Sequence, residues 1–372
     1  MNPNPLDHPR RYDWHGLFFP DDFEICWAGP VDGPTADSKW CCVGSTDGRS
    51  YLMKIVGPPH HFGILDEPAQ FPGKSKEAIN GIAESEGRLA VSTRSEMLTS
   101  DGVGRQGIIP IGAHGVEAMP GGRFVAACGP LGLTLIAGGR SGVFTETYKS
   151  MAGGQPRYVY RAVPLPQQSG LDVIACACRG EGILFFTRNT ATGKVRFLSM
   201  KYPGVDVVDV CVVRHGDQVL PIALGRDGML ITLPDPLAGG RGLSMKWDEP
   251  RGVAFRLLAS QGHLFVLTSR EFFAFPQLGE LLVKNAVTPG YRPPMIIGPP
   301  IEDVVDICLL SDNIIAMIRT DENRLAFAYI DQLVSLMESR VESYGSPDRP
   351  LQAPERTWED AADVSPQLVK MV

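Results

Sequence analysis

The chain alternates short apolar runs with tight polar turns along nearly all of its length. Two of these units are close copies of each other, Asp206–Cys211 (DVVDVC) and Asp303–Cys308 (DVVDIC), and each is followed within a few residues by a turn and another apolar run. A short run that is apolar throughout is typical of a strand buried on both faces. The pattern therefore predicts a succession of short β-strands joined by tight turns.

The turns mark a repeat. When the units are aligned on the first turn of each, successive first turns are separated by about 35 to 50 residues, and a second turn follows about ten residues later in most units. Asp-Gly is the strongest of these signals, because a two-residue hairpin turn needs positive φ at both central residues. The first turns are Asp37-Ser38, Glu86-Gly87, Gly121-Gly122, Ser169-Gly170, Gly216-Asp217, Gln261-Gly262 and Ser311-Asp312. The second turns are Asp47-Gly48, Leu131-Gly132, Glu181-Gly182, Asp227-Gly228 and Asp321-Glu322.

This repeat predicts an all-β protein that consists of a single β-propeller with seven blades, one for each of the first turns. Six or eight blades fit a slightly different alignment, because the first unit is long and the third is short. The alternation of strands and turns alone does not separate a propeller from a pair of β-sandwiches.

The composition of the runs predicts where each strand lies in a blade. Runs that are apolar on both faces are expected to be inner strands packed between neighbouring blades. These runs are Leu89–Val91, Phe124–Cys128, Val173–Cys178, Val219–Leu224, Leu264–Leu267 and Ile314–Ile318. The third strands carry larger side chains, which would fill the wider gap between blades farther from the axis. They are Leu184–Phe186, Phe272–Phe275 and Leu325–Tyr329.

The two ends of the chain differ from the repeat. Residues 1–20 form a Pro-rich N-terminal extension, in which Trp14–Phe19 offers a closing strand beside the last blade; the propeller spans residues 21–331. Residues 332–372 form a short helix and a flexible acidic tail, because apolar residues recur at helical spacing up to Arg340 and Pro and Gly follow. Three roles remain open for the tail: it folds back on the propeller, it is a peptide docked by another protein, or it is disordered.

Composition and charge narrow the function. The 41 Gly and 31 Pro suit many tight connections, and the net charge of −7 makes direct contact with nucleic acid an unfavoured function. The eight Cys lie mostly in apolar runs without a C-x-x-C pair, as expected for small buried side chains in a reducing compartment, and we expect the cytoplasm. We also expect neither a signal peptide nor contact with a membrane, since no apolar run reaches the roughly 18 residues that span a bilayer.

Over residues 20–331 the chain resembles the β-propeller superfamily. Val207–Leu233, with His215-Gly216 and Asp227-Gly228 between its apolar runs, is similar to a repeat of the regulator-of-chromosome-condensation type, and Asp306–Tyr329 has the same outline. The Gly-x-x-His-Ser/Thr element of those repeats is incomplete here. Gly262-His263 resembles the Gly-His of WD40 repeats, but no Trp-Asp closes that unit. The resemblance implies the architecture and carries over no family's functional residues.

The candidate catalytic residues have structural interpretations. Thr192–Phe197 resembles a quinoprotein blade motif once, with Phe in place of Trp, and fits a generic turn. His60-His61 should be exposed loop histidines, because adjacent side chains on an extended segment point apart and chelate poorly. Cys41-Cys42, Cys176 and Cys178 should be inert, since burial raises the pKa of a thiol. We therefore predict no catalytic residue, no metal site and no cofactor.

Two further groups of residues have the same kind of interpretation. The Gly-rich segments 138–142 and 239–242 lack the Lys-Ser/Thr of a phosphate-binding loop and should connect blades. The two DVVD runs contain four carboxylates, and we expect them to accept hydrogen bonds from turn amides in neighbouring connections rather than to bind a metal. They are Asp206, Asp209, Asp303 and Asp306.

A propeller without catalytic motifs is best explained as a non-enzymatic scaffold for protein–protein interaction, because its loops form broad surfaces on a rigid ring. By analogy it would be a subunit of a larger assembly, such as a bacterial regulatory or defence complex. The alternative is a lyase or hydrolase with a metal or an acid/base group in the central channel. The residues predicted to bind a partner are Trp358, Leu368 and Val369 in the tail and Arg140 and Arg241 in the Gly-rich loops. Arg157 and Arg161 would extend the two loop arginines into a small basic patch.

Overall fold

The structure is a computed structural model. It describes residues 14–31, 39–58, 60–64, 69–70, 77–100, 106–139, 142–148, 151–152, 155–156, 158–202, 204–215, 218–233, 237, 242–245, 252–284, 296–297, 304–319 and 323–335.

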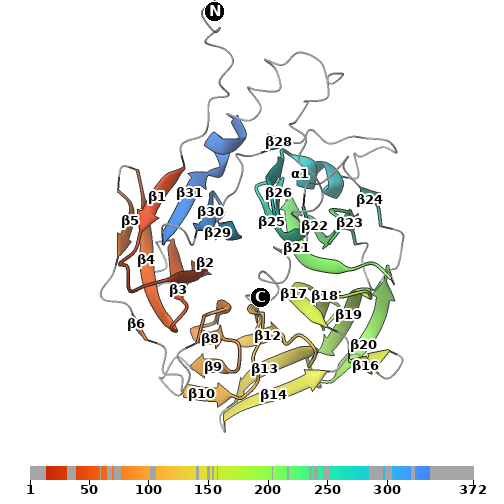
Figure 1. Ribbon diagram of the computed structural model, residues 1–372. Helices are drawn as coiled ribbons and strands as arrows, with labels where there is room; N and C mark the ends of the chain where they lie inside the picture. The colour runs from red at the N-terminus through yellow and green to blue at the C-terminus, as the bar shows by residue number, and fades with distance from the viewer. Residues whose placement is uncertain are drawn as a thin grey trace, which may run out of the picture.

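The described strands form seven antiparallel sheets arranged as blades around a ring, which confirms the predicted propeller and its blade number (Figure 1). Blades 1 to 3 consist of β2 (Ile25–Val31), β3 (Trp40–Ser45), β4 (Arg49–Gly57), β5 (His61–Ile64) and β6 (Ala69–Gln70); β7 (Gly81–Ser85), β8 (Arg88–Ser92), β9 (Met97–Ser100) and β10 (Gln106–Ile109); and β11 (Gly115–Met119), β12 (Arg123–Ala127), β13 (Leu133–Gly139) and β14 (Gly142–Tyr148).

Blades 4 to 7 follow the same antiparallel order. They consist of β17 (Val159–Gln168), β18 (Leu171–Cys178), β19 (Gly182–Asn189) and β20 (Val195–Lys201); β21 (Val207–His215), β22 (Gln218–Gly225), β23 (Leu230–Thr232) and β24 (Ser244–Met245); β25 (Ala254–Ser260), β26 (His263–Thr268), β27 (Phe272–Phe275) and β28 (Ile296–Ile297); and β29 (Val304–Ser311), β30 (Ile314–Arg319), β31 (Arg324–Tyr329) and β1 (His15–Phe18). A small hairpin, β15 (Met151–Ala152) and β16 (Gln155–Pro156), lies between blades 3 and 4 in the chain.

The first strand of each blade lies nearest the axis, because the first strands of neighbouring blades contact one another all round the ring (Figure 1). The fully apolar runs that we predicted to be inner strands packed between neighbouring blades form the second strands, in β8, β12, β18, β22, β26 and β30. Their residues are largely buried, as predicted, although the first strands lie closer to the axis. A second strand has a strand on either side and a neighbouring blade over each face, whereas a first strand also turns side chains toward the axis, where charge is tolerated.

The turns form as the sequence predicts. Both central residues of the first turn have positive φ in four blades, as in Ser169 (49°) and Gly170 (75°) of blade 4, which is the type I′ geometry that fits the twist of a hairpin. The first turn of blade 7 lies one residue later than predicted, at Asp312-Asn313, because β29 extends to Ser311. The first turns of blades 1 and 5 fall outside the described residues.

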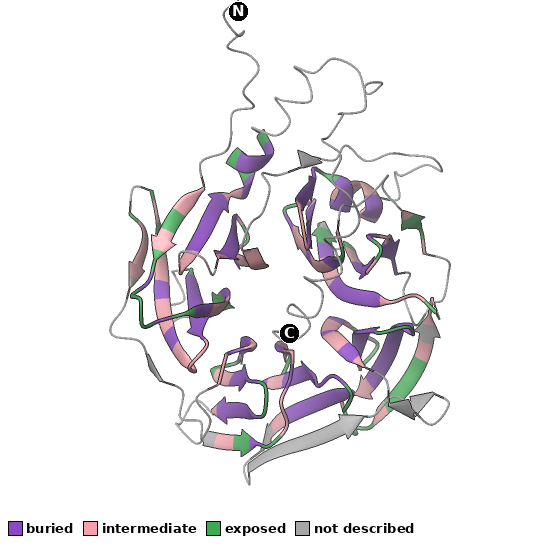
Figure 2. Ribbon diagram, viewed as in Figure 1, coloured by how far each residue is buried: buried purple, intermediate pink, exposed green. Residues whose placement is uncertain are grey.

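The hydrophobic core lies between the blades rather than at the axis (Figure 2). The third strands contribute large side chains to it, as predicted: Phe185, Phe272 and Phe327 are each at most 2% exposed. Phe272 also stacks on Phe265 of the adjacent second strand, with 6.0 Å between ring centroids. Burial of whole aromatic rings between blades supplies much of the free energy that holds the blades together.

Two short helices occur among the described residues. The predicted C-terminal helix is present at 330–335, and the rest of its predicted span lies outside the described residues. The sequence analysis did not predict α1 (Leu278–Val283), which follows β27 in blade 6. Leu278 and Leu282 of α1 pack into the core between blades 5 and 6, so the helix covers an apolar surface that β28 leaves open.

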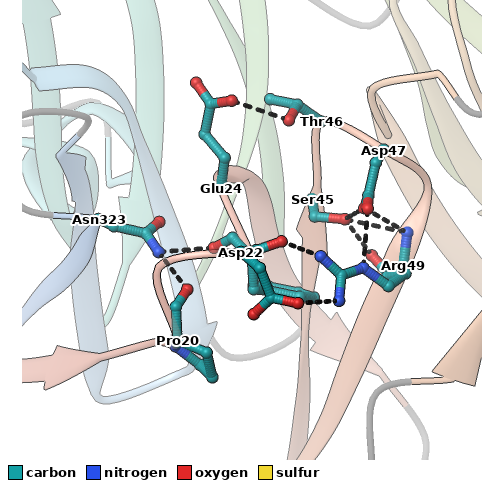
Figure 3. Close-up of polar contacts among 9 residues, drawn as sticks. Pro20, Asp22, Glu24, Ser45, Thr46, Asp47, Arg49 and Asn323 are labelled. Atoms are coloured by element: carbon teal, nitrogen blue, oxygen red, sulfur yellow. Dashed lines mark hydrogen bonds and ion pairs between the residues drawn. The ribbon is translucent and has the colours of Figure 1, made fainter.

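The ring closes where the chain enters blade 1. β1 pairs with β31 and so supplies the outermost strand of blade 7, with His15 opposite Phe327. Next to this pairing, the Asn323 amide fastens the segment that leads into β2 (Figure 3). Its Nδ2 donates to the carbonyls of Pro20 (2.9 Å) and Phe23 (2.7 Å), and its Oδ1 accepts the amide of Ile25 (3.0 Å). The first and last blades are therefore joined by strand pairing and by a polar clamp.

Candidate functional site

Five of the seven first strands contain a β-bulge, and in four of these a charged residue follows it. A register shift separates Val207 from Asp209 in β21 and Val304 from Asp306 in β29, which explains the spacing of the DVVD runs. The same shift precedes Arg161 in β17 and Arg256 in β25. A β-bulge redirects the following side chain, so charged residues of opposite sign come to lie on adjacent strands.

Together with Glu117 of β11, these residues form a belt of alternating charge across blades 3 to 7, which we call the charge belt. Its members are Glu117, Arg161, Asp209, Arg256 and Asp306. Arg161 forms an ion pair with Glu117, and its Nε lies 3.8 Å from Asp209 Oδ1. Arg256 binds Asp306 through two hydrogen bonds, from Nε to Oδ1 (2.8 Å) and from Nη2 to Oδ2 (2.5 Å). Each pair joins the first strands of neighbouring blades.

The charge belt is stable because the opposite charges of its side chains offset the cost of burying each charge. Burial acts to lower the pKa of Arg256, but Asp306 and Asp209 outweigh it and hold that pKa above its usual range. Burial raises the pKa of Asp209, which Arg256 and Arg161 oppose. A buried charge is costly unless it is paired, and each of these has a partner of opposite sign.

The belt corrects the expected role of the DVVD carboxylates in one respect. Asp209 accepts backbone amides as predicted, but from Val210 and from Leu257 of the neighbouring blade (both 2.8 Å), which are strand residues rather than turn residues. Asp306 accepts the amide of Ile307 in addition to its arginine. Asp206 lies outside the belt and pairs with Arg226 (3.0 Å). Asp303 falls outside the described residues.

The second turn of each blade lies on the same face of the ring as the start of its first strand, and we call this face the second-turn face. Hydrogen bonds fasten the turns to the start of the first strand. The amide of Arg179 donates to the carbonyl of Tyr158 (3.0 Å), and that of Arg226 to the carbonyl of Asp206 (2.8 Å). The carbonyl of Arg226 also accepts the amide of Ala254 in the next blade (3.1 Å). The second turns are therefore held from both sides.

An arginine recurs at these turns. It is present in six of the seven blades, as Arg49, Arg94, Arg179, Arg226, Arg270 and Arg319. The carboxylates of the same turns differ in exposure: Asp47 and Asp227 accept amides two residues ahead but stay accessible to solvent, whereas Glu181 is 4% exposed. In blade 1 the arginine already has carboxylate partners, because Arg49 forms ion pairs with Asp22 and Asp47 (Figure 3). Arg94 and Arg179, in contrast, are exposed.

Aromatic residues accompany the arginines at blades 3 to 5. His114 Nε2 and the Tyr158 hydroxyl are 2.7 Å apart, and the rings of Tyr158 and Tyr160 lie 5.0 Å apart. Arg226 Nη2 donates to the Tyr160 hydroxyl (3.4 Å), and the backbone of Arg179 is bonded to that of Tyr158. We call these five residues the arginine–tyrosine rim. Arginine and tyrosine are the residue types that contribute most to binding energy at protein interfaces.

The rim keeps its aromatic groups uncharged near neutral pH. Burial lowers the pKa of His114. Burial also raises the pKa of Tyr158, with a further increase from Tyr160 that Arg179 opposes. The positive charge of the rim therefore resides on its two guanidinium groups.

The five residues predicted to bind a partner, Trp358, Leu368, Val369, Arg140 and Arg241, fall outside the described residues and stay predictions, as does Arg157. Arg161 belongs to the charge belt, so it is not available for the basic patch proposed from the sequence. Sequence reasoning missed the rim. An alignment of the second turns would have found its arginines, because an arginine lies at or next to that turn in six blades.

His60-His61 is only partly as predicted. His60 is exposed, but His61 begins β5 and its Nδ1 lies 2.9 Å from the Tyr329 hydroxyl. The ring of His15 is 4.6 Å from that of His61, so three aromatic side chains meet where blade 7 adjoins blade 1. Burial, followed by the charges of His15 and His60, lowers the pKa of His61. Among the described residues, no group of three metal-ligating side chains is present.

The cysteines behave as the sequence predicts. All eight are free, and six of them are buried. Burial raises the pKa of Cys42 to about 12 despite hydrogen bonds that lower it, and raises those of Cys176, Cys211 and Cys308 well above the usual range. A thiol with so high a pKa carries no thiolate at neutral pH and is a poor nucleophile.

No helix among the described residues has the length and apolar character required to cross a bilayer. Neither a protein-family model nor a curated protein sequence matches the chain. Among solved structures it is similar to PorZ, an essential bacterial surface component of the type-IX secretion system of Porphyromonas gingivalis, with a TM-score of 0.50 and 17% identity over 86% of this chain; the match spans only 38% of the PorZ chain. It is also similar to BBS1N, crystallised in complex with ARL6DN, with a TM-score of 0.52 and 12% identity over 86% of this chain and 97% of that chain. At these identities the similarity concerns the fold alone. Together with the seven sheets arranged in a ring, it identifies the chain as a seven-bladed β-propeller.

Proposed function

We propose that this propeller is a non-enzymatic scaffold that binds a protein partner and belongs to a larger assembly. The observation that carries the proposal is that some charged residues of the ring are paired inside it while others are exposed at its surface. Those nearest the axis neutralise one another in the charge belt, while Arg179 of the second-turn face is exposed beside Tyr158. A rigid ring that carries arginine and tyrosine on fixed turns is suited to recognition.

Two further points support the proposal. PorZ is a component of a secretion system and BBS1N forms a complex with ARL6DN, so propellers of similar shape act together with other proteins. By analogy, this chain would be a subunit of a regulatory or defence complex in bacteria. The eight free cysteines favour a reducing compartment, and we propose that the protein acts in the cytoplasm.

Affinity purification tests the proposal. A tagged copy of the full chain, produced in its native host at its natural level, is purified and then separated by size-exclusion chromatography with light scattering. We expect a second protein to co-elute in a fixed molar ratio. Elution of the chain as a monomer without a partner would count against the scaffold. Elemental analysis of the same sample provides a second check, because a stoichiometric Ca²⁺ or Zn²⁺ would favour the alternative enzyme with a metal in the channel.

A further inference from the structure

We infer that the arginine–tyrosine rim binds an acidic segment of the protein partner, one in which carboxylates alternate with apolar side chains. This inference rests on the proposed scaffold function and names the surface and the chemistry by which it would act. The rim consists of His114, Tyr158, Tyr160, Arg179 and Arg226 on blades 3 to 5.

The rim has guanidinium donors available for a carboxylate. Among the described residues, no carboxylate pairs with Arg179, which is exposed. Arg226 is already engaged, because its buried Nε lies 3.0 Å from Asp206 and its Nη2 donates to Tyr160, so Arg179 supplies the free donors of the rim. An arginine binds a carboxylate with two parallel hydrogen bonds, which makes it better suited than lysine to this recognition.

The aromatic residues provide the apolar part of the same surface. Tyr158 and Tyr160 lie 5.0 Å apart with their rings inclined at 54°, and His114 adjoins Tyr158 with 5.3 Å between centroids. All three are partly exposed. Tyrosine contributes a large contact area and loses little conformational entropy on binding, so an apolar side chain of the partner would pack against these rings while its carboxylates reach the arginines.

The rim is already ordered. The backbone of Arg226 is hydrogen-bonded to Asp206 in its own blade and to Ala254 in the next, and that of Arg179 is bonded to Tyr158. In blade 3, the residue between β12 and β13 is joined in the same way, because Gly129 exchanges two hydrogen bonds with Val159 of blade 4. Binding at this site requires little ordering of the backbone, which leaves more of the interaction energy for affinity.

The charge around the rim favours an acidic protein over a nucleic acid. A nucleic-acid strand is a continuous polyanion that would extend along the face, and the chain as a whole carries a net charge of −7. The second-turn face is also acidic at blade 1, where Asp21, Asp22 and Glu24 are exposed. At the rim itself, Asp206 pairs with Arg226 and Asp227 is exposed in the same turn, so a short acidic segment would bind on the Arg179 side, away from these carboxylates.

The test measures binding of a defined probe to the full chain. The probe is a fluorescein-labelled dodecapeptide in which Glu occupies every second position, with Leu, Tyr and Ser between, and the control peptide carries Lys in place of Glu. Fluorescence anisotropy at low salt compares the wild type with Arg179→Glu and with Arg196→Glu. Arg196 is exposed on β20 of the same blade, so its replacement changes the net charge equally at a distance from the rim. Tyr158→Ala tests the aromatic part.

We expect the acidic peptide to bind, Arg179→Glu to weaken binding at least about tenfold, and Arg196→Glu to change it less than about twofold. Tyr158→Ala should weaken binding by a similar factor, with circular dichroism confirming the fold. Equal effects of the two arginine variants, equal binding of the Lys peptide, or no binding would overturn the inference. Tighter binding of a single-stranded oligonucleotide that displaces the peptide would also overturn it. If the partner captured from the native host co-elutes equally with Arg179→Glu, the scaffold function stands and the assignment of the rim is wrong.

Discussion

At the scale of single residues, Asp209 is the side chain on which the charge belt depends most. It is almost fully buried, it lies beside Arg161 and Arg256, and it accepts the amide of Leu257 in the next blade (2.8 Å). In Asp209→Ala two arginines lose their shared carboxylate and a buried amide loses its acceptor. We expect the free energy of unfolding to fall by about 3 kcal/mol, measured by urea denaturation.

Asp206→Ala is the matched control for that variant. Asp206 lies three residues earlier in the same DVVD run, but its side chain is 30% exposed and its ion pair with Arg226 is correspondingly screened. We expect this variant to lose less than about 1 kcal/mol. If both variants lost the same free energy, the belt would have no special role in stability.

His114 provides a prediction about pH. Burial lowers its pKa, so the folded protein binds fewer protons than the unfolded chain as the solution becomes acidic. The stabilising contribution of neutral His114 is complete above the unfolded pKa of about 6.5 and is lost as the pH falls through the lower folded pKa. His61, whose pKa is also lowered, adds to the same trend. We therefore expect the free energy of unfolding to decrease from pH 7 to pH 5.

The substitution His114→Gln tests this assignment, because Gln retains a polar group near the Tyr158 hydroxyl and does not titrate. The variant should show a smaller decrease in unfolding free energy between pH 7 and pH 5 than the wild type, measured by urea denaturation at each pH. An unchanged pH dependence would mean that other groups, such as His61, account for the loss.

At the scale of structural elements, ring closure depends on the turn between β30 and β31. Asn323 has a φ of 45°, and its amide makes three hydrogen bonds to the segment that leads into blade 1. Asn323→Ala removes these bonds, leaves the amide of buried Ile25 without its acceptor, and replaces Asn, which tolerates a left-handed conformation, with Ala, which adopts it less readily. We expect a loss of about 3 kcal/mol in the free energy of unfolding.

Asn323→Gly separates the two effects. Glycine adopts positive φ without strain but makes none of the side-chain hydrogen bonds, so this variant should be about 1 kcal/mol more stable than Asn323→Ala and still less stable than the wild type. Thermal denaturation followed by circular dichroism ranks the three proteins. A glycine variant as stable as the wild type would show that the clamp contributes nothing.

Elements set by local chemistry were predictable from the sequence, and those set by distant partners were not. The turn at Ser169-Gly170 could be located because two adjacent residues determine its φ angles. The charge belt could not, since Arg256 and Asp306 are 50 residues apart and meet only because successive blades stack. The sequence likewise did not show which strand lies nearest the axis, because an apolar run indicates that a strand is buried but not which neighbours bury it. The rim could not be predicted for the same reason, because its residues lie on three different blades.

At the scale of the whole molecule, the blades are not equally well supported. The strands of blade 2 are four or five residues long, whereas those of blade 4 are seven to ten. Among the described residues, the cluster between blades 1 and 2 has five buried residues and that between blades 2 and 3 has ten, compared with twelve between blades 3 and 4. At the bulge position of blade 1, Trp27 replaces the charged residue. Blade 2 therefore has less apolar burial and no part in the belt.

This inequality predicts where the ring opens first. Local opening requires least free energy where buried contacts are fewest, so hydrogen exchange followed by mass spectrometry should show the amides of β8 exchanging at least about tenfold faster than those of β18. In Asp209→Ala, exchange in blades 4 to 6 should accelerate while exchange in β8 stays the same, because the belt does not reach blade 2. Uniform protection in the wild type, or equal acceleration of every blade in the variant, would instead mean that the ring unfolds as one unit and that the belt stabilises it as a whole.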